Sequence, residues 1–276
     1  MKHARHFQMG FTLIEAIIVI VLTGILAVVA ARFMSRPIEQ YRDNVKRAAL
    51  SDIANTAVRR ISRDIHSALP NSVRSVASNC VEFIPTKTGG RYFSGVAPNA
   101  FTTEAPITNF DVVGPLALAP VPGDSVVIYN LGIPGSDAYA AADNRVTLTA
   151  ATTTNLSFAL KLFTLGSPGN RFHVIDKDEQ AVSYVCLPSS GTIPAGDGGL
   201  TLWRISRYGF RASPAVCEAA VGSAVTSILA DGLNACTFAF SNGPIERSAT
   251  VTMRLQMTKG GETLSLYNDV NVNNVP

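Results

Sequence analysis

Residues 11–31 read FTLIEAIIVIVLTGILAVVAA, a stretch of 21 residues whose single charged side chain is Glu15. As a helix with a rise of about 1.5 Å per residue, it would be roughly 30 Å long, which matches the hydrocarbon core of a bilayer. It is longer than the apolar region of a secretory signal peptide, about 7–15 residues, and no small-residue cleavage site ends it. The pattern therefore predicts a transmembrane helix that stays attached to the chain.

A short basic leader, residues 1–10, precedes this stretch and contains Lys2 and Arg5 but no acidic residue. These charges favour a cytoplasmic N-terminus, whereas Arg32 and Arg36 just beyond the stretch favour the opposite orientation. The cysteines and the large C-terminal part favour a head outside the cytoplasm. We therefore expect a single-pass protein of the inner membrane with a periplasmic head.

Glu15 is an unusual residue because a carboxylate inside an apolar helix costs a few kcal/mol and usually has a positively charged partner. Cleavage after Gly10 would create such a partner, the free amine of Phe11, which could reach Glu15 of a neighbouring helix. The alternative is that Glu15 turns toward the membrane interface, since it lies near the start of the apolar stretch.

The residues MGFTLIE at 9–15, followed by the apolar stretch, resemble the signature of type IV prepilins. The resemblance implies that an integral-membrane prepilin peptidase cleaves between Gly10 and Phe11 and methylates Phe11. It also implies that Glu15 acts in subunit assembly, with other major and minor pilins as partners, and that the protein ends in an extracellular pilus. This resemblance covers about the first 30 residues, and Met9 stands where a basic residue is usual.

Residues 32–69 predict an amphipathic helix with one apolar stripe opposite charged faces. Pro37 predicts a kink, and the helix is expected to end at Pro70. The stripe consists of residues spaced by four, namely Tyr41, Val45, Ala49, Ile53, Ala57, Ile61, Ile65 and Leu69. An alternative is that this basic helix lies on a membrane surface.

Residues 70–276 predict a β-rich head, and the whole chain is expected to be α+β: a long N-terminal helix packed on an antiparallel sheet, as in type IV pilins. The clearest strand is 249–258, with Val251, Met253 and Leu255 on one face, and the turn after Lys259 leads into a partner strand. Further strands are expected at 81–84, 125–129, 145–148, 156–162, 172–175, 182–187, 200–208 and 235–240. Long loops are expected at 95–123, 131–144 and 188–199.

The four cysteines, Cys80, Cys186, Cys217 and Cys236, form no CxxC and lie far from histidines, so zinc binding is poorly supported. Their even number behind a membrane segment favours two disulfides in an oxidising compartment. Of the three possible pairings, we favour Cys217–Cys236 with Cys80–Cys186. Four buried thiols are the alternative.

The head also resembles minor pilins of the MshO type from the mannose-sensitive haemagglutinin (MSHA) pilus, within the wider group of W-type minor pilins and J-type pseudopilins. The similar segments are 69–72, 80–83, 167–172, 182–186 and 274–276. This resemblance implies a low-abundance subunit of a tip or priming complex.

We expect no enzymatic activity, cofactor or metal, because no catalytic or nucleotide-binding motif is present. His66 and His173 are expected at the surface or on an edge strand, and the acidic residues at 176–179 as a solvated turn rather than a calcium site. The slightly acidic head argues against nucleic-acid binding. The alternatives are a type II secretion pseudopilin, a tip-displayed adhesin using the loops 95–123 or 131–144, and a tethered periplasmic enzyme.

Overall fold

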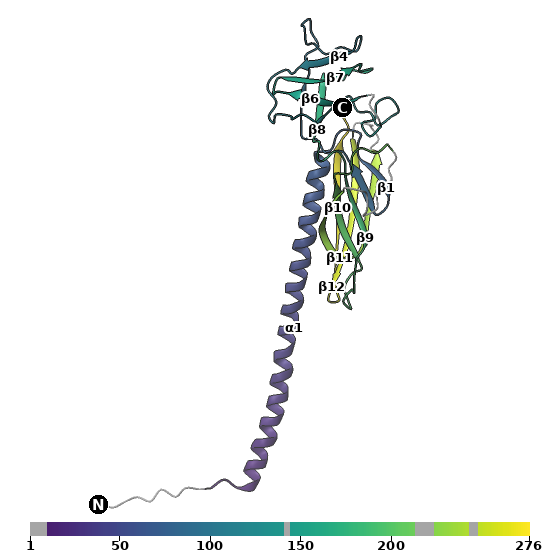
Figure 1. Cartoon of the computed structure of the whole chain (residues 1–276). Helices are drawn as coiled ribbons and strands as arrows, with labels where there is room; N and C mark the ends of the chain where they lie inside the picture. The colour runs from purple at the N-terminus through teal and green to yellow at the C-terminus, as the bar shows by residue number, and fades with distance from the viewer. Residues whose placement is uncertain (1–9, 141–143, 213–223, 243–247) are drawn as a thin grey trace, which may run out of the picture. The chain divides into compact units, whose positions relative to one another are not determined.

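A computed structural model describes residues 10–140, 144–212, 224–242 and 248–276. The chain divides into two compact units, Met1–Ala49 and Leu50–Pro276. The described residues form one long helix and thirteen strands, and every strand pair is antiparallel. The fold is therefore α+β, with an apolar N-terminal helix and a mostly antiparallel β body (Figure 1).

Helix α1 covers Leu13–His66 and continues through Pro37. It ends before the predicted end at Leu69, because the chain there has begun to pair with residues beyond the helix. The Leu69 amide donates to the Ile84 carbonyl at 2.7 Å, and Ala68 forms a bridge with Pro85.

A seven-stranded sheet in Leu50–Pro276 has the order β1-β2-β9-β10-β11-β12-β13. Its strands are β1 (Arg74–Ala77), β2 (Cys80–Phe83), β9 (Val182–Pro188), β10 (Leu200–Ser206), β11 (Val225–Asn242), β12 (Ser248–Lys259) and β13 (Glu262–Asn273). The predicted β12–β13 hairpin is confirmed. Lys259 pairs with Glu262, and Gly260 and Gly261 between them both have positive φ, as tight two-residue hairpin turns require.

A second sheet of six strands has the order β3-β8-β5-β6-β7-β4. Its strands are β3 (Thr88–Arg91), β4 (Ile107–Asp111), β5 (Ser125–Ile128), β6 (Arg145–Ala151), β7 (Asn155–Lys161) and β8 (Arg171–Ile175). The predicted antiparallel head thus contains two sheets, and the loop predicted at 95–123 was wrong because it contains β4. That strand lies at the edge of the six-stranded sheet, where it pairs with β7.

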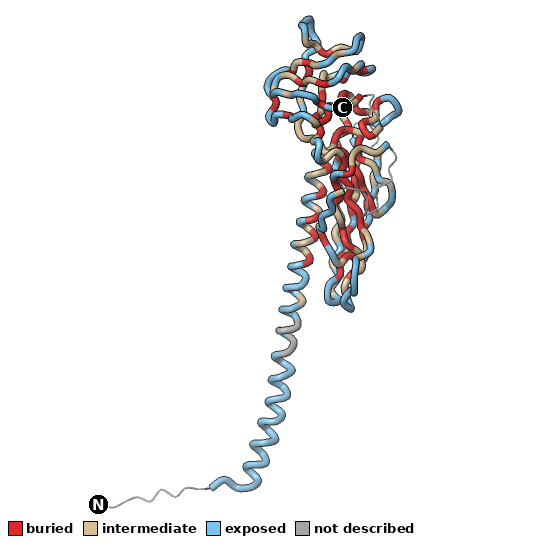
Figure 2. Tube along the Cα trace, in the orientation of Figure 1, coloured by how far each residue is buried: buried red, intermediate tan, exposed pale blue. Residues whose placement is uncertain are grey.

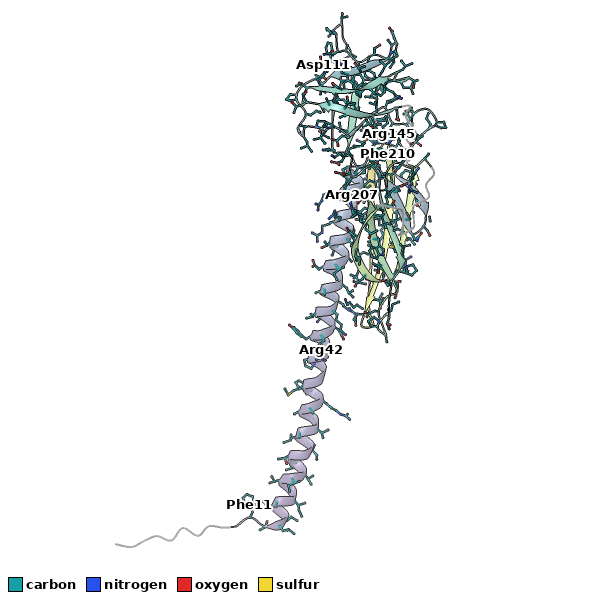
Figure 3. The ribbon with its side chains drawn as sticks, viewed as in Figure 1. Phe11, Arg42, Asp111, Arg145, Arg207 and Phe210 are labelled. Atoms are coloured by element: carbon teal, nitrogen blue, oxygen red, sulfur yellow. A yellow bond between two sulfur atoms is a disulfide. The ribbon has the colours of Figure 1, made fainter. Side chains whose placement is uncertain are left out.

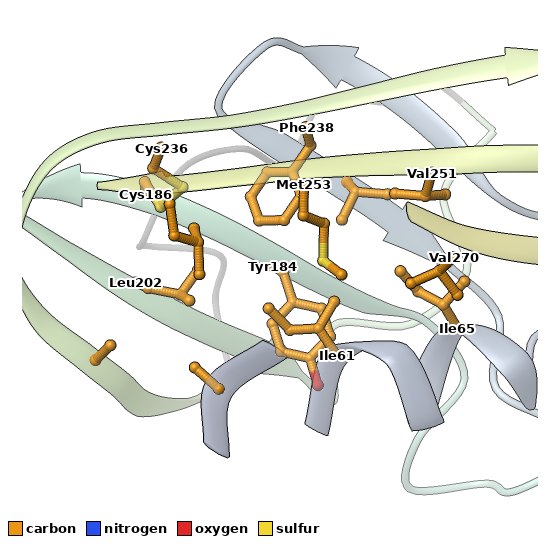
Figure 4. Close-up of a cluster of buried hydrophobic side chains, with 14 of the residues drawn as sticks. Ile61, Ile65, Tyr184, Cys186, Leu202, Cys236, Phe238, Val251, Met253 and Val270 are labelled. Carbon is orange, nitrogen blue, oxygen red and sulfur yellow. A yellow bond between two sulfur atoms is a disulfide. The ribbon is translucent and has the colours of Figure 1, made fainter. Parts of the chain in front are cut away.

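The main core lies between α1 and the seven-stranded sheet (Figure 4). The helix contributes Leu50, Ala54, Ala57, Ile61 and Ile65, each at most 2% exposed. The sheet contributes alternate residues of its strands, among them Phe83, Tyr184, Leu202, Phe238, Val251, Met253 and Val270.

The predicted stripe is correct only in part. Tyr41 is 71% exposed and Val45 50% exposed, although both belong to the series spaced by four. No described residue between 10 and 49 is buried, so these two positions are exposed whichever face of the helix they occupy. The buried series begins only at Leu50 and continues through Ala54 and Ala57.

Two further cores stabilise the six-stranded sheet and join it to the seven-stranded one. One face is lined by aromatic side chains with neighbouring ring centroids 4.0–6.0 Å apart, namely Tyr92, Phe101, Phe110, Phe158, Phe163 and Phe172. A separate cluster combines residues of both sheets, including Val127 and Ile175 of one with Val185 and Ile205 of the other. The two sheets are thus packed together within Leu50–Pro276.

The observed disulfide joins Cys186 to Cys236, with Cα atoms 6.2 Å apart, so both favoured pairings were wrong. Cys80 pairs with Val185 in the β2–β9 ladder, and neighbouring residues of a strand face opposite sides. Cys80 therefore lies in the cluster between the sheets, whereas Cys186 lies in the main core.

The β1–β2 turn forms hydrogen bonds with both strands that carry this disulfide, β9 and β11. The Asn79 carbonyl accepts from the Cys186 amide at 3.0 Å, and the Ser78 carbonyl accepts from the Phe238 amide at 2.6 Å. Cys80 is itself disulfide-bonded, and Cys217 lies outside the described residues.

Candidate functional site

The predicted cleavage residues, Gly10 and Phe11, lie just before the first turn of α1 and are exposed, Phe11 by 79% (Figure 3). On the C-terminal side of the Gly10–Phe11 bond, a peptidase would meet Phe11 and Thr12, which lie outside regular secondary structure. Helical geometry begins only at Leu13.

Thr12 caps the helix. Its carbonyl accepts from the Ala16 amide at 3.1 Å, and its Oγ1 accepts from the Glu15 amide at 3.4 Å. Threonine at the N-cap followed by glutamate three residues later is the pattern of a capping box, which satisfies amides that lack partners within the helix. This role of Thr12 was not among the sequence predictions, although the TLIE pattern at 12–15 is a sufficient signal for it.

Glu15 is thus placed in the first turn of α1, where a carboxylate is favoured by the positive end of the helix dipole. Its side chain is exposed. The residue has two possible uses: it supports the start of its own helix, and it offers a negative charge to a partner outside the chain.

The segment Leu13–Met34, 22 residues long with a mean hydropathy of 2.9, is long and apolar enough to cross a membrane. None of it is buried within the chain, and large apolar side chains are exposed all around it (Figure 2). The Thr23 hydroxyl donates to the Val19 carbonyl at 2.7 Å, so this polar group needs no water. Such a segment requires lipid or other helices to cover it.

The opposite end of α1 is held to the sheet by polar contacts as well as by its apolar face. Asp64 accepts from the Tyr184 hydroxyl at 2.6 Å and from Arg204 Nε at 3.2 Å. Arg204 also binds Glu179 through two hydrogen bonds of 3.0 and 3.1 Å. Burial, and then the hydrogen bond and charge of Asp64, raise the pKa of Tyr184, so this hydroxyl remains protonated and able to donate.

A second polar network holds β1 and β2 against the loop that follows β10. Glu82, 1% exposed, accepts from Arg74 and from the Tyr208 hydroxyl, the latter at 2.9 Å. The Arg74 guanidinium lies 3.5 Å from the centroid of the Tyr139 ring. Burial, the largest cause, and then Glu82 raise the pKa of Tyr208. Each charged or hydroxyl group in this network has a partner, as a stable buried network requires.

His66 and His173 lie on α1 and β8, and two of the acidic residues at 176–179 form ion pairs. His66 is exposed on the last turn of α1, whereas His173 lies on β8, an interior strand between β3 and β5, so the edge-strand prediction was wrong for it. Asp176 binds Lys87 at 3.0 Å and Glu179 binds Arg204. Among the described residues, no group of three or more His, Cys, Asp or Glu side chains could hold a metal ion.

Comparisons of the chain with protein-family models, curated proteins and solved structures found no match.

Proposed function

We propose that the protein is a minor pilin of a type IV pilus of the MSHA-like kind, a structural and assembly subunit of a tip or priming complex. In this proposal, prepilin peptidase cleaves between Gly10 and Phe11 and methylates Phe11. The mature subunit remains in the inner membrane through the apolar segment of α1, with its head in the periplasm, until it enters the pilus.

The observation that carries the proposal is the order of features at the start of the chain. An exposed Gly10–Phe11 junction is followed at once by the Thr12 cap, by Glu15 and by a helical segment that is apolar on all sides. A membrane anchor alone needs only the apolar segment. The glycine before it and the carboxylate within it have a use if the new amine of Phe11 binds Glu15 of a neighbouring subunit.

The packed half of α1 supplies further support. Its outer face carries Arg59 and Arg63 on the side opposite the buried Ile61, with Arg60 beside them, and all three are exposed. In a fibre, this basic face would bind acidic surfaces of neighbouring heads. The fold of a long helix packed on an antiparallel sheet is compatible with a pilin-like subunit.

The decisive experiment separates the two uses of Glu15. Glu15→Gln keeps the length and polarity that a capping box accepts but removes the charge, whereas Glu15→Ala removes both. If Glu15 binds the Phe11 amine of a neighbour, both variants are cleaved normally but are depleted from purified pili. Cleavage and methylation are measured by mass spectrometry of the N-terminal peptide, and incorporation by quantitative immunoblotting of the pili.

Asp43→Asn is the matched control, because Asp43 is a second carboxylate on α1 but lies outside the apolar segment. It should be incorporated normally. Normal incorporation of Glu15→Gln alongside depletion of Glu15→Ala would mean that Glu15 acts only as a cap, and the charge pair would be abandoned.

A deletion strain tests the wider proposal. Loss of surface pili, restored by the intact gene, is the expected result, counted by electron microscopy. Normal pili together with lost protein secretion would contradict it and would indicate a type II secretion pseudopilin instead.

A further inference from the structure

A cavity of about 380 Å³ lies on the face of the six-stranded sheet that points away from its aromatic core. It is lined by side chains of β5, β6 and β7 and of two later loops, namely Ser125, Arg145, Val146, Thr147, Ala159, Lys161, Gln180 and Phe210. Its volume lies in the usual range of small-molecule sites, about 300–1,000 Å³. Two of these residues are cationic and none is acidic.

Strand register explains why the charged side chains share one face. Val127 on β5 pairs with Arg145 on β6, and Leu148 on β6 pairs with Phe158 on β7. Arg145 and Lys161 therefore stand at the same end of neighbouring strands.

Arg145, a lining residue of the cavity, stacks on Phe210, and the two residues are labelled close to each other in Figure 3. The carbon of its guanidinium lies 3.6 Å from the centroid of the Phe210 ring, and its Nη2 donates to the Ala140 carbonyl at 3.3 Å. Stacking occupies a face of the planar guanidinium and leaves its edge, which carries the remaining N–H donors, available for a planar acceptor.

The charge of Arg145 has no close counterion in the described part of the chain. No carboxylate there lies within ion-pair distance of it, in contrast to Arg74 and Arg204, which both have one. Burial lowers the pKa of Arg145 to about 10, and the more distant Asp137 opposes this only in part. A half-buried cation in this situation is stabilised by any anion that enters beside it.

We propose that this cavity binds the carboxylate of a small hydroxylated acid, an acidic monosaccharide or the acidic unit of a glycan. The edge of the Arg145 guanidinium would bind the carboxylate through two parallel hydrogen bonds. Lys161 would add a second positive charge, although its ammonium also lies 6.0 Å from the Phe163 ring. Thr147 and Gln180 offer a hydroxyl and an amide to the hydroxyl groups of the ligand.

The experiment is a titration of the full chain in detergent micelles with sodium D-glucuronate, followed by saturation-transfer NMR and calorimetry. D-Glucose is the uncharged control and inorganic phosphate is the anion without a carboxylate. We expect glucuronate to bind with a Kd of about 1 mM or tighter and the two controls to bind at least about tenfold more weakly.

Variants locate the site. Arg145→Gln should weaken glucuronate binding by about 10–100-fold. Arg145→Lys keeps the positive charge but cannot donate two parallel hydrogen bonds to a carboxylate, so it should have an intermediate effect. Arg254→Gln, a change at an exposed arginine on β12 outside the cavity, should leave binding unchanged. Fluorescence of Trp203 and circular dichroism verify that each variant is folded.

Absence of glucuronate binding would overturn the proposal. So would equal binding of glucose, which would remove the role of the charge, or equal binding of phosphate, which would remove the role of the carboxylate. Unchanged binding by folded Arg145→Gln would place the ligand elsewhere and would also overturn it.

Discussion

The two ends of α1 share a secondary structure but have different ways of removing apolar side chains from water. Over Leu50–His66, one stripe is buried against the sheet, and Ala54 and Ala57 let the backbones approach closely. Over Leu13–Met34, the apolar side chains face all directions and none is buried by the chain itself. The comparison shows that helicity does not reveal what covers a helix. The distribution of apolar residues around its axis does.

The largest expected effect comes from isoleucine truncations in the two ends. Ile61→Ala should reduce the free energy of unfolding of the head by about 2–5 kcal/mol, because it leaves a cavity in the main core. Ile20→Ala, at a position 70% exposed, should change it by less than about 0.5 kcal/mol. Urea unfolding of the full chain in micelles, followed by Trp203 fluorescence, measures both values. Equal losses would refute the contrast between the two ends.

A pH titration sharpens the comparison through two histidines. Burial, and then the charge of Arg171, lower the pKa of His173 from 6.5 to about 4, whereas His66 is exposed on the packed end of α1. Between about pH 4 and pH 6.5, the unfolded chain therefore binds a proton at His173 that the folded head does not bind. The stability due to neutral His173 is complete above pH 6.5 and is lost as the pH falls toward 4.

The slope should reach at most about 1.4 kcal/mol per pH unit, for a total loss of up to about 3 kcal/mol. His173→Gln should flatten the slope over this window, and His66→Gln should not. The measurement is the urea midpoint at several pH values. Identical slopes for the wild type and His173→Gln would show that this residue does not couple to folding.

Two carboxylate variants compare the side of α1 that contacts the sheet with the side that faces solvent, within Leu50–His66. Asp64→Ala should destabilise the head by about 1–3 kcal/mol, since the Tyr184 hydroxyl and Arg204 Nε lose their acceptor. Asp52→Ala, an exposed position on the same helix, should stay within about 0.5 kcal/mol of the wild type. A comparable loss for Asp52→Ala would mean that the polar face of the helix is not merely solvated.

The smallest effect is expected at the apolar end. Thr12→Ala should weaken the first turn by about 0.5–2 kcal/mol without changing the urea midpoint of the head. Hydrogen exchange of the Glu15 and Ala16 amides should become faster, and Thr12→Ser should restore it. An unchanged exchange rate in Thr12→Ala would rule out the cap.

Sequence patterns predicted the elements with strong periodicity. The apolar segment, the alternating strand around Val251 and the turn at Gly260 and Gly261 were all expected, because each depends on neighbours in sequence. Strand β4 was missed because it lies in a proline-rich stretch. The four-residue stripe was wrong at Tyr41 and Val45 because the sequence pattern does not mark that burial begins only at Leu50.

Features that depend on distant residues could not be predicted in the same way. The Cys186–Cys236 bond joins β9 to β11, two strands that are separated by β10 in the sheet and by 50 residues between the cysteines. The cavity at Arg145 combines five separate stretches of chain, from Ser125 to Phe210, and becomes visible only when the sheet is assembled. The Thr12 cap, in contrast, is local and could have been predicted from the TLIE pattern.

The Cys186–Cys236 bond also has a mechanical consequence for the head. Under a load applied between Cys186 and Cys236 themselves, tension passes directly from one sulfur to the other, so β10 and the first half of β11 carry none of it. With a sequence separation of 50 residues and about 3.3–3.6 Å of extended chain per residue, the bond withholds roughly 170 Å of contour length. A head pulled at these two residues in an oxidising medium would therefore stretch less before the chain between them comes taut, and breaking this bond would release that length.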